Sequence, residues 1–237
     1  MSNPKYTCEF ICLANSRKTS GRCVAGKLIG PAEKGRWVRP VSARSTAELS
    51  ETDRQFRGGD SPKVGDVLRV PMKSAVVHPY QIENHLIDDG FYWSKVGEIG
   101  WTNLVSLVDP ALGPLWENGS SSYSGYNDRV DEDRAAKAVL TFGGSLCLIR
   151  VNDLTVRVAV EGAEFNNAKR RVRGEFSYSG HRYRVAITDP VAGNAYLAQG
   201  DGNYAVGDSL LCLSLGDAYG GFAYKLIAAV FFPPIVP

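Results

Sequence analysis

Short segments with strand-like patterns, separated by Gly, Pro, Asn and Asp, run through most of this 237-residue chain. Alternating segments at a spacing of about 10 residues are typical of β-barrels, because successive side chains of a strand face opposite sides. We expect strands in the first half at 6–14, 22–29, 35–42, 64–72 and 75–84. We expect strands in the second half at 145–151, 155–162, 206–216 and 224–232, and a hairpin over 170–190 that turns at Ser179–Gly180.

Two stretches have helical rather than strand character. Ser45 followed by Glu48 fits a capping box, so a short helix is predicted between the third and fourth strands. A second short helix is predicted at 130–139, inside a stretch that is otherwise rich in Pro, Gly and Ser. The fold class predicted from these patterns is all-β with short helices.

One phrase occurs in both halves of the chain. VGDVLRV at 64–70 and VGDSLLCL at 206–213 each place Val-Gly-Asp before an apolar strand, late in their half and after a basic strand pair. Three identical residues are a weak match, but their matching position suggests two related small barrels. We therefore expect a first barrel over 1–100, a connector with a short helix over 101–137 and a second barrel over 138–237.

Positive charge is concentrated in two segments, although the net charge is only +2. Residues 15–44 hold eight Lys or Arg residues and one acid, Glu33, and residues 169–184 hold six and one acid, Glu175. Such segments suggest basic surfaces that contact an anionic partner. Solvated cations on strand edges, which discourage aggregation, are the alternative.

The segment NSRKTSGRCVAGKLIG at 15–30 tests three chemistries. Gly21, Gly26 and Lys27 have the spacing of a phosphate-binding loop, but Leu28 stands where that loop needs Ser or Thr. Cys23 has no histidine near it in sequence to act as a base, and the spacing of His78 and His85 matches no standard metal site. With Asp88 only a minor acid–base candidate, we predict no catalytic residues, no metal and no cofactor.

Binding of nucleic acid is the chemistry that remains, because single strands are held by cations along the backbone and by aromatic faces against the bases. Alternation places Trp37 with Arg39 on one strand face, Arg171 with Arg173, and Arg182 with Arg184. Core packing is the alternative for Trp37 and Tyr183. The predicted nucleic-acid contacts are Arg17, Lys18, Arg22, Arg36, Trp37, Arg39, Arg170, Arg171, Arg173, Arg182 and Arg184.

Several phrases together resemble the dual-OB domain family of prokaryotes. They are ICLANSRKTSGRCVAGK, GRWVRPVS, SLCLIRVNDLTVRV, KRRVRGEFSYSGHRYRVAITDP and YKLIAAV, and they cover nearly the whole chain. The resemblance implies two tandem OB-like small β-barrels and a nucleic-acid-binding role as an accessory protein of a defence or mobile-element system, and it carries no catalytic residues. The positions that match the family's first two phrases are Ser16, Arg17, Lys18, Ser20, Gly21, Arg22, Trp37, Arg39 and Pro40.

The function expected from the sequence is sequence-tolerant binding of single-stranded or structured DNA or RNA. A protein–protein interaction module is the first alternative, because the apolar end AAVFFPPIVP could dock on a partner, and an enzyme acting on nucleic acid or nucleotides is the second. The five scattered cysteines suggest buried thiols in a reducing compartment. With no signal-peptide core and no apolar run of 18 residues, we expect a soluble cytoplasmic protein without membrane contact.

Overall fold

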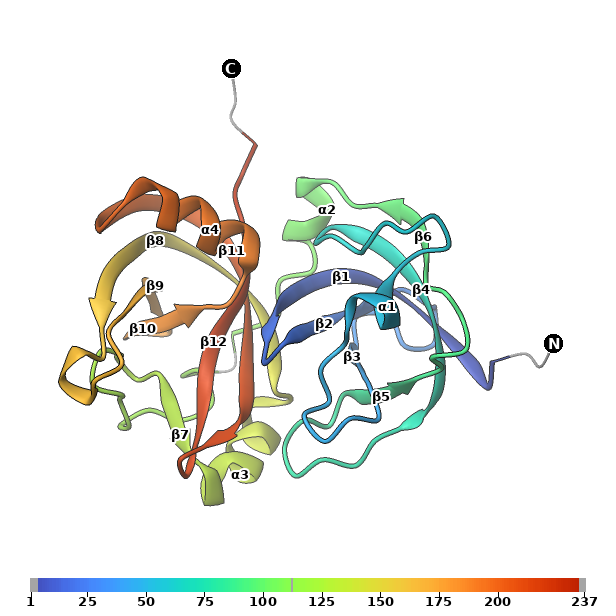
Figure 1. Cartoon of the computed structure of the whole chain (residues 1–237), viewed down its shortest axis with the longest axis horizontal. Coiled ribbons are helices and arrows are strands. Elements are labelled where there is room, and N and C mark those ends of the chain that lie inside the picture. Colours follow the sequence, from blue (N-terminus) through green and yellow to red (C-terminus); the bar gives the residue numbers. More distant parts are fainter. Residues whose placement is uncertain (1–3, 112, 235–237) are drawn as a thin grey trace. The chain divides into compact units, whose positions relative to one another are not determined.

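The computed structural model describes residues 4–111 and 113–234, and the chain divides into two compact units at Leu107/Val108. In each unit the strands curve around an interior of their own (Figure 1). The predicted connector at 101–137 stays a prediction, although Leu115 and Trp116 are buried among residues of the second unit.

The first unit is a closed barrel of five strands. They pair in the cycle β1-β2-β3-β5-β4-β1, in which only β3 and β5 are parallel. The strands are β1 (Tyr6–Lys18), β2 (Gly21–Leu28), β3 (Trp37–Val41), β4 (Asp66–Ala75) and β5 (Asn84–Ile87). Helix α1 (Glu51–Arg54) lies between β3 and β4, and β6 (Ser94–Glu98) and α2 (Trp101–Val105) follow.

The second unit repeats this plan. Its cycle is β8-β9-β10-β12-β11-β8, and again only the third and fifth strands, β10 and β12, are parallel. The strands are β8 (Leu146–Glu161), β9 (Lys169–Tyr178), β10 (His181–Ile187), β11 (Gly202–Tyr219) and β12 (Phe222–Phe231). Strand β7 (Arg129–Asp131) and helix α3 (Glu132–Phe142) precede the barrel, the 3-10 turn η1 (Ala163–Phe165) follows β8, and α4 (Pro190–Gln199) lies between β10 and β11. Both barrels thus have the strand order of an OB-fold, and the predicted fold class is confirmed.

The repeated Val-Gly-Asp phrase lies at the fourth strand of both barrels. Gly65 directly precedes β4, and Gly207 lies inside β11 beside a register irregularity; their φ angles of 92° and 81° lie in the left-handed region that favours glycine. The prediction of two related barrels from this phrase is confirmed by the topology.

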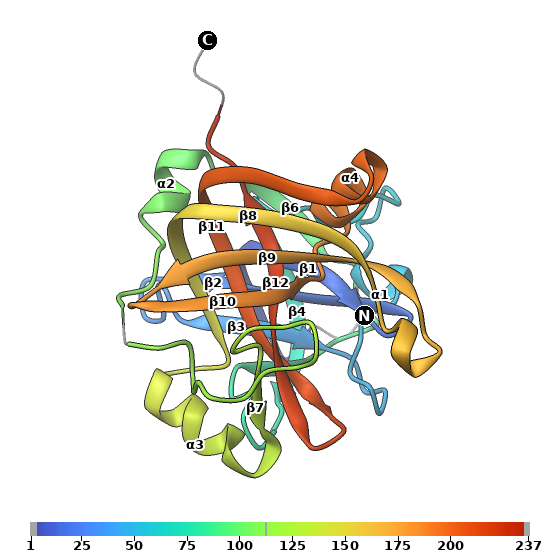
Figure 2. The ribbon, with the colours of Figure 1, turned by 90° about the vertical axis from the view of Figure 1, so that its left-hand side faces the viewer.

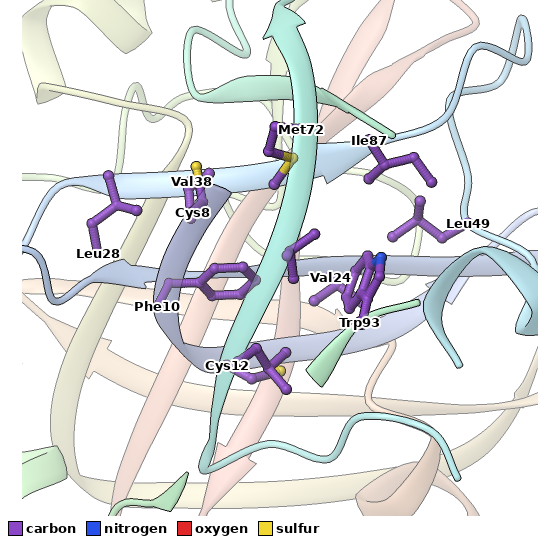
Figure 3. Close-up of a cluster of buried hydrophobic side chains, with 12 residues drawn as sticks. Cys8, Phe10, Cys12, Val24, Leu28, Val38, Leu49, Met72, Ile87 and Trp93 are labelled. Carbon is purple, nitrogen blue, oxygen red and sulfur yellow. The ribbon is translucent and has the colours of Figure 1, made fainter. Parts of the chain in front are cut away.

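Large apolar side chains from every strand fill the first barrel. Phe10, Val24, Met72 and Trp93 converge there with eight other buried residues (Figure 3). Removal of this much apolar surface from water is the main driving force for closing the barrel.

Local element predictions were partly wrong. Of the strand predicted at 75–84, only Ala75 and Asn84 lie in strands, because the Nδ1 atom of His78 accepts the backbone N–H groups of Tyr80 and Gln81 in a turn. The helix predicted from Ser45 begins at Glu51 instead.

The capping box that starts α1 is formed by Ser50 and Asp53, so a second polar pair one turn further along takes the role predicted for Ser45. The second predicted helix exists as α3, and it ends at Gly143 with a φ of 91°. The segments 145–151 and 155–162 form one continuous strand, β8. Elements α2, β6, β7 and α4 were not predicted.

Candidate functional site

A cleft of about 600 Å³ opens on the second barrel. Its floor is the outward face of β9, β10 and β12, and its walls are the segment after β8 and the chain from Ser122 to Arg129. That chain runs beside β10, where Tyr126 and Arg184 form a backbone bridge (Figure 2). The lining includes Arg171, Arg173, Ala186, Tyr219, Tyr224 and Leu226.

Three aromatic side chains of the cleft face water. Tyr123, Phe165 and Tyr219 are 78%, 67% and 81% exposed, and the rings of Tyr123 and Phe165 meet edge to face with centroids 5.8 Å apart. Phe165 sits in η1, and Tyr219 directly precedes the Gly220–Gly221 turn between β11 and β12. Exposed aromatic faces on turns are suited to stacking against planar ligands.

Two arginines of β9 line the cleft, and they differ in availability. Arg173 is largely enclosed, and its guanidinium is held by Glu161 at 2.8 Å and by Asp128 at 3.4 Å. Arg171 is 44% exposed, and its Nε lies 3.9 Å from Glu161. An exposed, loosely held ion pair is easily exchanged for a ligand anion, so Arg171 is the cation best placed to contact one.

A buried lysine lies beneath the cleft. The Nζ of Lys225 donates to the Glu117 carbonyl oxygen at 2.5 Å and to Asn118 Oδ1 at 3.2 Å, and it lies 5.2 Å from the centre of the Tyr183 ring. Burial lowers the pKa of Lys225 to about 7, against the opposing effect of the Asp128 and Glu117 carboxylates. Lys225 therefore fastens the chain that leads into the cleft wall onto β12.

The lowered pKa of Lys225 predicts a pH-dependent stability. Unfolding restores the ordinary pKa of 10.5, so between about pH 7 and about pH 10 the unfolded chain binds a proton that the folded chain lacks. The contribution of Lys225 to the free energy of unfolding should then rise by about 1 kcal/mol per pH unit in this range, and it should not change with pH below about pH 6. Urea unfolding of wild type and Lys225→Met across this range measures it. A difference between the two proteins that does not change with pH would contradict the assignment.

The predicted arginines of the second barrel are only partly brought together. As alternation predicted, Arg171 with Arg173 and Arg182 with Arg184 point outward, opposite to buried Val172 and Tyr183. Carboxylates compensate most of them: Glu175, the one acid of the basic segment, lies 2.7 Å from Arg184, and Asp153 lies 3.7 Å from Arg182. By alternation Arg170 lies on the other face of β9 from Arg171 and Arg173, and it pairs with Asp201 at 2.6 Å.

The predicted contacts of the first barrel form two separate groups. Arg17 and Arg22 are cross-strand partners beside the β1–β2 turn, next to Lys18, and they line a shallow pocket of about 250 Å³. The second group, Arg36 and Trp37, lies at the other end of β2. Arg36 pairs with Glu33 at 2.7 Å, and the Trp37 ring lies 5.2 Å from Lys27 Nζ. Eight strand residues span roughly 23 Å, so the two groups do not share a site. As ligand contacts, these residues stay predictions.

The predicted phosphate contact at Arg39 was wrong. Its side chain is 1% exposed, its Nη1 lies 3.3 Å from Asn84 Oδ1, and its Nη2 lies 3.8 Å from the buried carboxylate of Glu83. Alternation placed it correctly on the outward face of β3. That face is covered at this point, so Arg39 is a structural cation.

Sequence reasoning missed the residues that shape the cleft most. Tyr123 lies in a loop, Phe165 lies in η1, Tyr219 is the last residue of β11, and Lys225 lies in an apolar strand, so strand alternation did not mark these residues as a site. The signal for the three aromatics was their position beside Gly-rich or Asn-rich turns.

The residues considered for other chemistry have structural environments. His85 Nδ1 is 2.7 Å from the Tyr6 hydroxyl, and the predicted buried thiols are confirmed for Cys8, Cys12, Cys147 and Cys212, whereas Cys23 is half-buried. Within residues 4–111 and 113–234, His, Cys, Asp and Glu side chains form no group of three or more that could hold a metal ion. In the same described part of the chain, none of the helices is long and apolar enough to cross a membrane.

Comparison with known proteins agrees with the two OB-type topologies. The sequence profile of the dual OB-containing domain family matches residues 8–230, which span both barrels. Neither a curated protein nor a solved structure matches the chain. Because the profile covers nearly the whole sequence, the chain belongs to the dual OB-containing domain family.

Proposed function

We propose that this protein binds single-stranded nucleic acid in the cleft of its second barrel. OB-folds bind oligonucleotides on the face of strands 2 and 3, between the loops that follow strands 1 and 4. In the second barrel these are β9 and β10, the segment that holds Phe165, and the turn at Tyr219. The observation that carries the proposal is that the cleft lies on this face and combines three exposed aromatic rings with Arg171.

The cleft favours unpaired bases over a duplex. Stacking on Tyr123, Phe165 or Tyr219 needs the flat face of a base, which a duplex buries between neighbouring pairs. A volume of about 600 Å³ suits a short unpaired segment. Because stacking does not read hydrogen-bonding edges, we propose that binding tolerates many sequences. A binding role fits an OB-fold family better than catalysis, and a place in a prokaryotic defence system stays a prediction from the resemblance.

Fluorescence anisotropy with labelled strands tests the proposal. Single-stranded DNA and RNA of about 12 nucleotides should bind more tightly than the matching duplex. Affinity should fall between about 50 and about 200 mM salt, with a shallow slope because few phosphates are contacted. Absence of binding at the lower salt concentration, or equal affinity for the duplex, would overturn the proposal.

Arg171→Ala supplies the residue-level test. Loss of one phosphate contact should weaken binding by about threefold to tenfold and reduce the salt slope by about 0.7 for a single strand. Arg150→Ala is the matched control, because Arg150 is also an exposed strand arginine paired with a carboxylate, Asp208, but does not line the cleft. Equal losses in the two variants would indicate a diffuse charge effect instead.

A further inference from the structure

The two barrels share a matching residue pair where their second and third strands meet. In the first barrel Gly26 pairs with Val38, and in the second Gly174 pairs with Val185. Both glycines allow a close approach: a Cβ atom would overlap the Ile11 carbonyl oxygen at Gly26 and the Ile227 side chain at Gly174. Both valines point into their barrel and are fully buried.

The next residue points outward and differs between the barrels. Val38 is followed by Arg39, which stands opposite Asn84 of the fifth strand. Val185 is followed by Ala186, which stands opposite Leu226 of the fifth strand. Arg39 and Ala186 thus occupy the same position, where the parallel pairing of the third and fifth strands begins.

In the first barrel this position is filled. The Arg39 guanidinium lies against Asn84 and Glu83, and the Asn84 amide donates in turn to Gln81 Oε1 at 3.3 Å. Gln81, Glu83 and Asn84 are themselves buried. This polar cluster comes from the loop after the fourth strand, which in other OB-folds borders the ligand.

In the second barrel the same position is open. Ala186 and Leu226 line the cleft together with Arg171 and Arg173. The turn after the fourth strand is the tight Gly220–Gly221 turn, and the long β11–β12 hairpin carries Tyr219 at its tip, where it is exposed. A methyl group instead of a guanidinium leaves the outward face accessible.

We infer that nucleic-acid bases are taken up by the second barrel alone, and that the outward residue of the third strand decides which barrel is open. This inference rests on the proposed function. The arginine at this position closes the first barrel's face, and the alanine keeps the second barrel's face available. Charge alone would favour the opposite assignment, since the first barrel carries the arginine.

Ala186→Arg tests the inference in the full chain, because it gives the second barrel the first barrel's residue. Binding of a labelled single-stranded oligonucleotide should weaken about tenfold or more, although the substitution adds a positive charge. Ala205→Arg is the matched control: Ala205 is exposed on β11 and does not line the cleft, so this variant should bind as well as wild type. Circular dichroism and thermal unfolding check that both variants are folded.

The outcomes separate the two proposals. If wild type binds no oligonucleotide, the proposed function fails; if wild type binds and folded Ala186→Arg binds equally well, only the further inference fails. Should Ala186→Arg not fold, Ala186→Met fills the position without charge and must show the same loss. A double variant Arg17→Ser/Arg22→Ser should retain stacking-dependent affinity, and a loss as large as that of Ala186→Arg would also overturn the inference.

Discussion

Replacing Arg39 with methionine is expected to destabilise the first barrel by about 3–5 kcal/mol. The guanidinium is buried beside Asn84 and 3.8 Å from the Glu83 carboxylate, which is also buried. Methionine retains much of the side-chain volume but leaves Glu83 in a poorly solvated site without a cation. Urea unfolding followed by circular dichroism and tryptophan fluorescence measures the loss.

A second substitution separates loss of the ion pair from loss of packing. Arg39→Met/Glu83→Gln removes the uncompensated charge and should recover a large part of the lost stability. Arg36→Met is the control just before the same strand, since Arg36 is 70% exposed and its pair with Glu33 should contribute less than about 1 kcal/mol. A small stability loss in Arg39→Met accompanied by weaker oligonucleotide binding would mean that Arg39 is a ligand contact after all.

The barrels could be predicted because their strands carry local signals. Alternation at Trp37–Val38–Arg39 assigned the outward and inward sides correctly, and the Val-Gly-Asp phrase marked the start of β4 and a position inside β11. Both signals depend on residues close in sequence. The helices were harder to predict: α1 begins at Glu51 because Ser50 and Asp53 form its capping box, and Ser45 with Glu48 offered an equally plausible local pattern.

Surface charge could not be predicted from the basic segments, because several of their counter-ions lie outside those segments. Glu161 of β8 pairs with Arg173 of the neighbouring strand β9. Asp201, which directly precedes β11, pairs with Arg170. A window of sequence counts the cations and misses these acids. The basic hairpin of β9 and β10 therefore carries less uncompensated charge than its composition suggests, and Arg171 is left as the most available arginine of the cleft.

The cleft could not be predicted because it is assembled from three separated stretches. The chain at 122–129 reaches β10 with the help of two distant residues: Lys225, 96 or more residues later, and Tyr183 hold the preceding residues by hydrogen bonds to Glu117 and Leu115. Such contacts depend on the closed barrel. Sequence analysis identified the basic strands but not the exposed aromatic residues that border the cleft with them.

Removing two of the exposed aromatic faces of the cleft is expected to have the largest effect on binding. Phe165→Ala and Tyr219→Ala each delete a ring that is exposed in the unliganded protein, so neither should disturb the core. Stacking contributes about 1–3 kcal/mol per base, so each substitution should weaken single-strand binding by about 5-fold to 150-fold. The double variant should reduce binding further, measured by fluorescence anisotropy at fixed salt.

The salt dependence identifies the cause of that loss. Neither ring neutralises a phosphate, so the slope of affinity against salt should stay at the wild-type value in the double variant, whereas Arg171→Ala should reduce it. Tyr92→Ala is the matched control, because Tyr92 is a half-exposed aromatic residue of the first unit, outside the cleft. If Tyr92→Ala weakened binding as much as Phe165→Ala and Tyr219→Ala, bases would not be held specifically by the second barrel. An unchanged affinity in the double variant would remove stacking from the mechanism and leave only phosphate contacts.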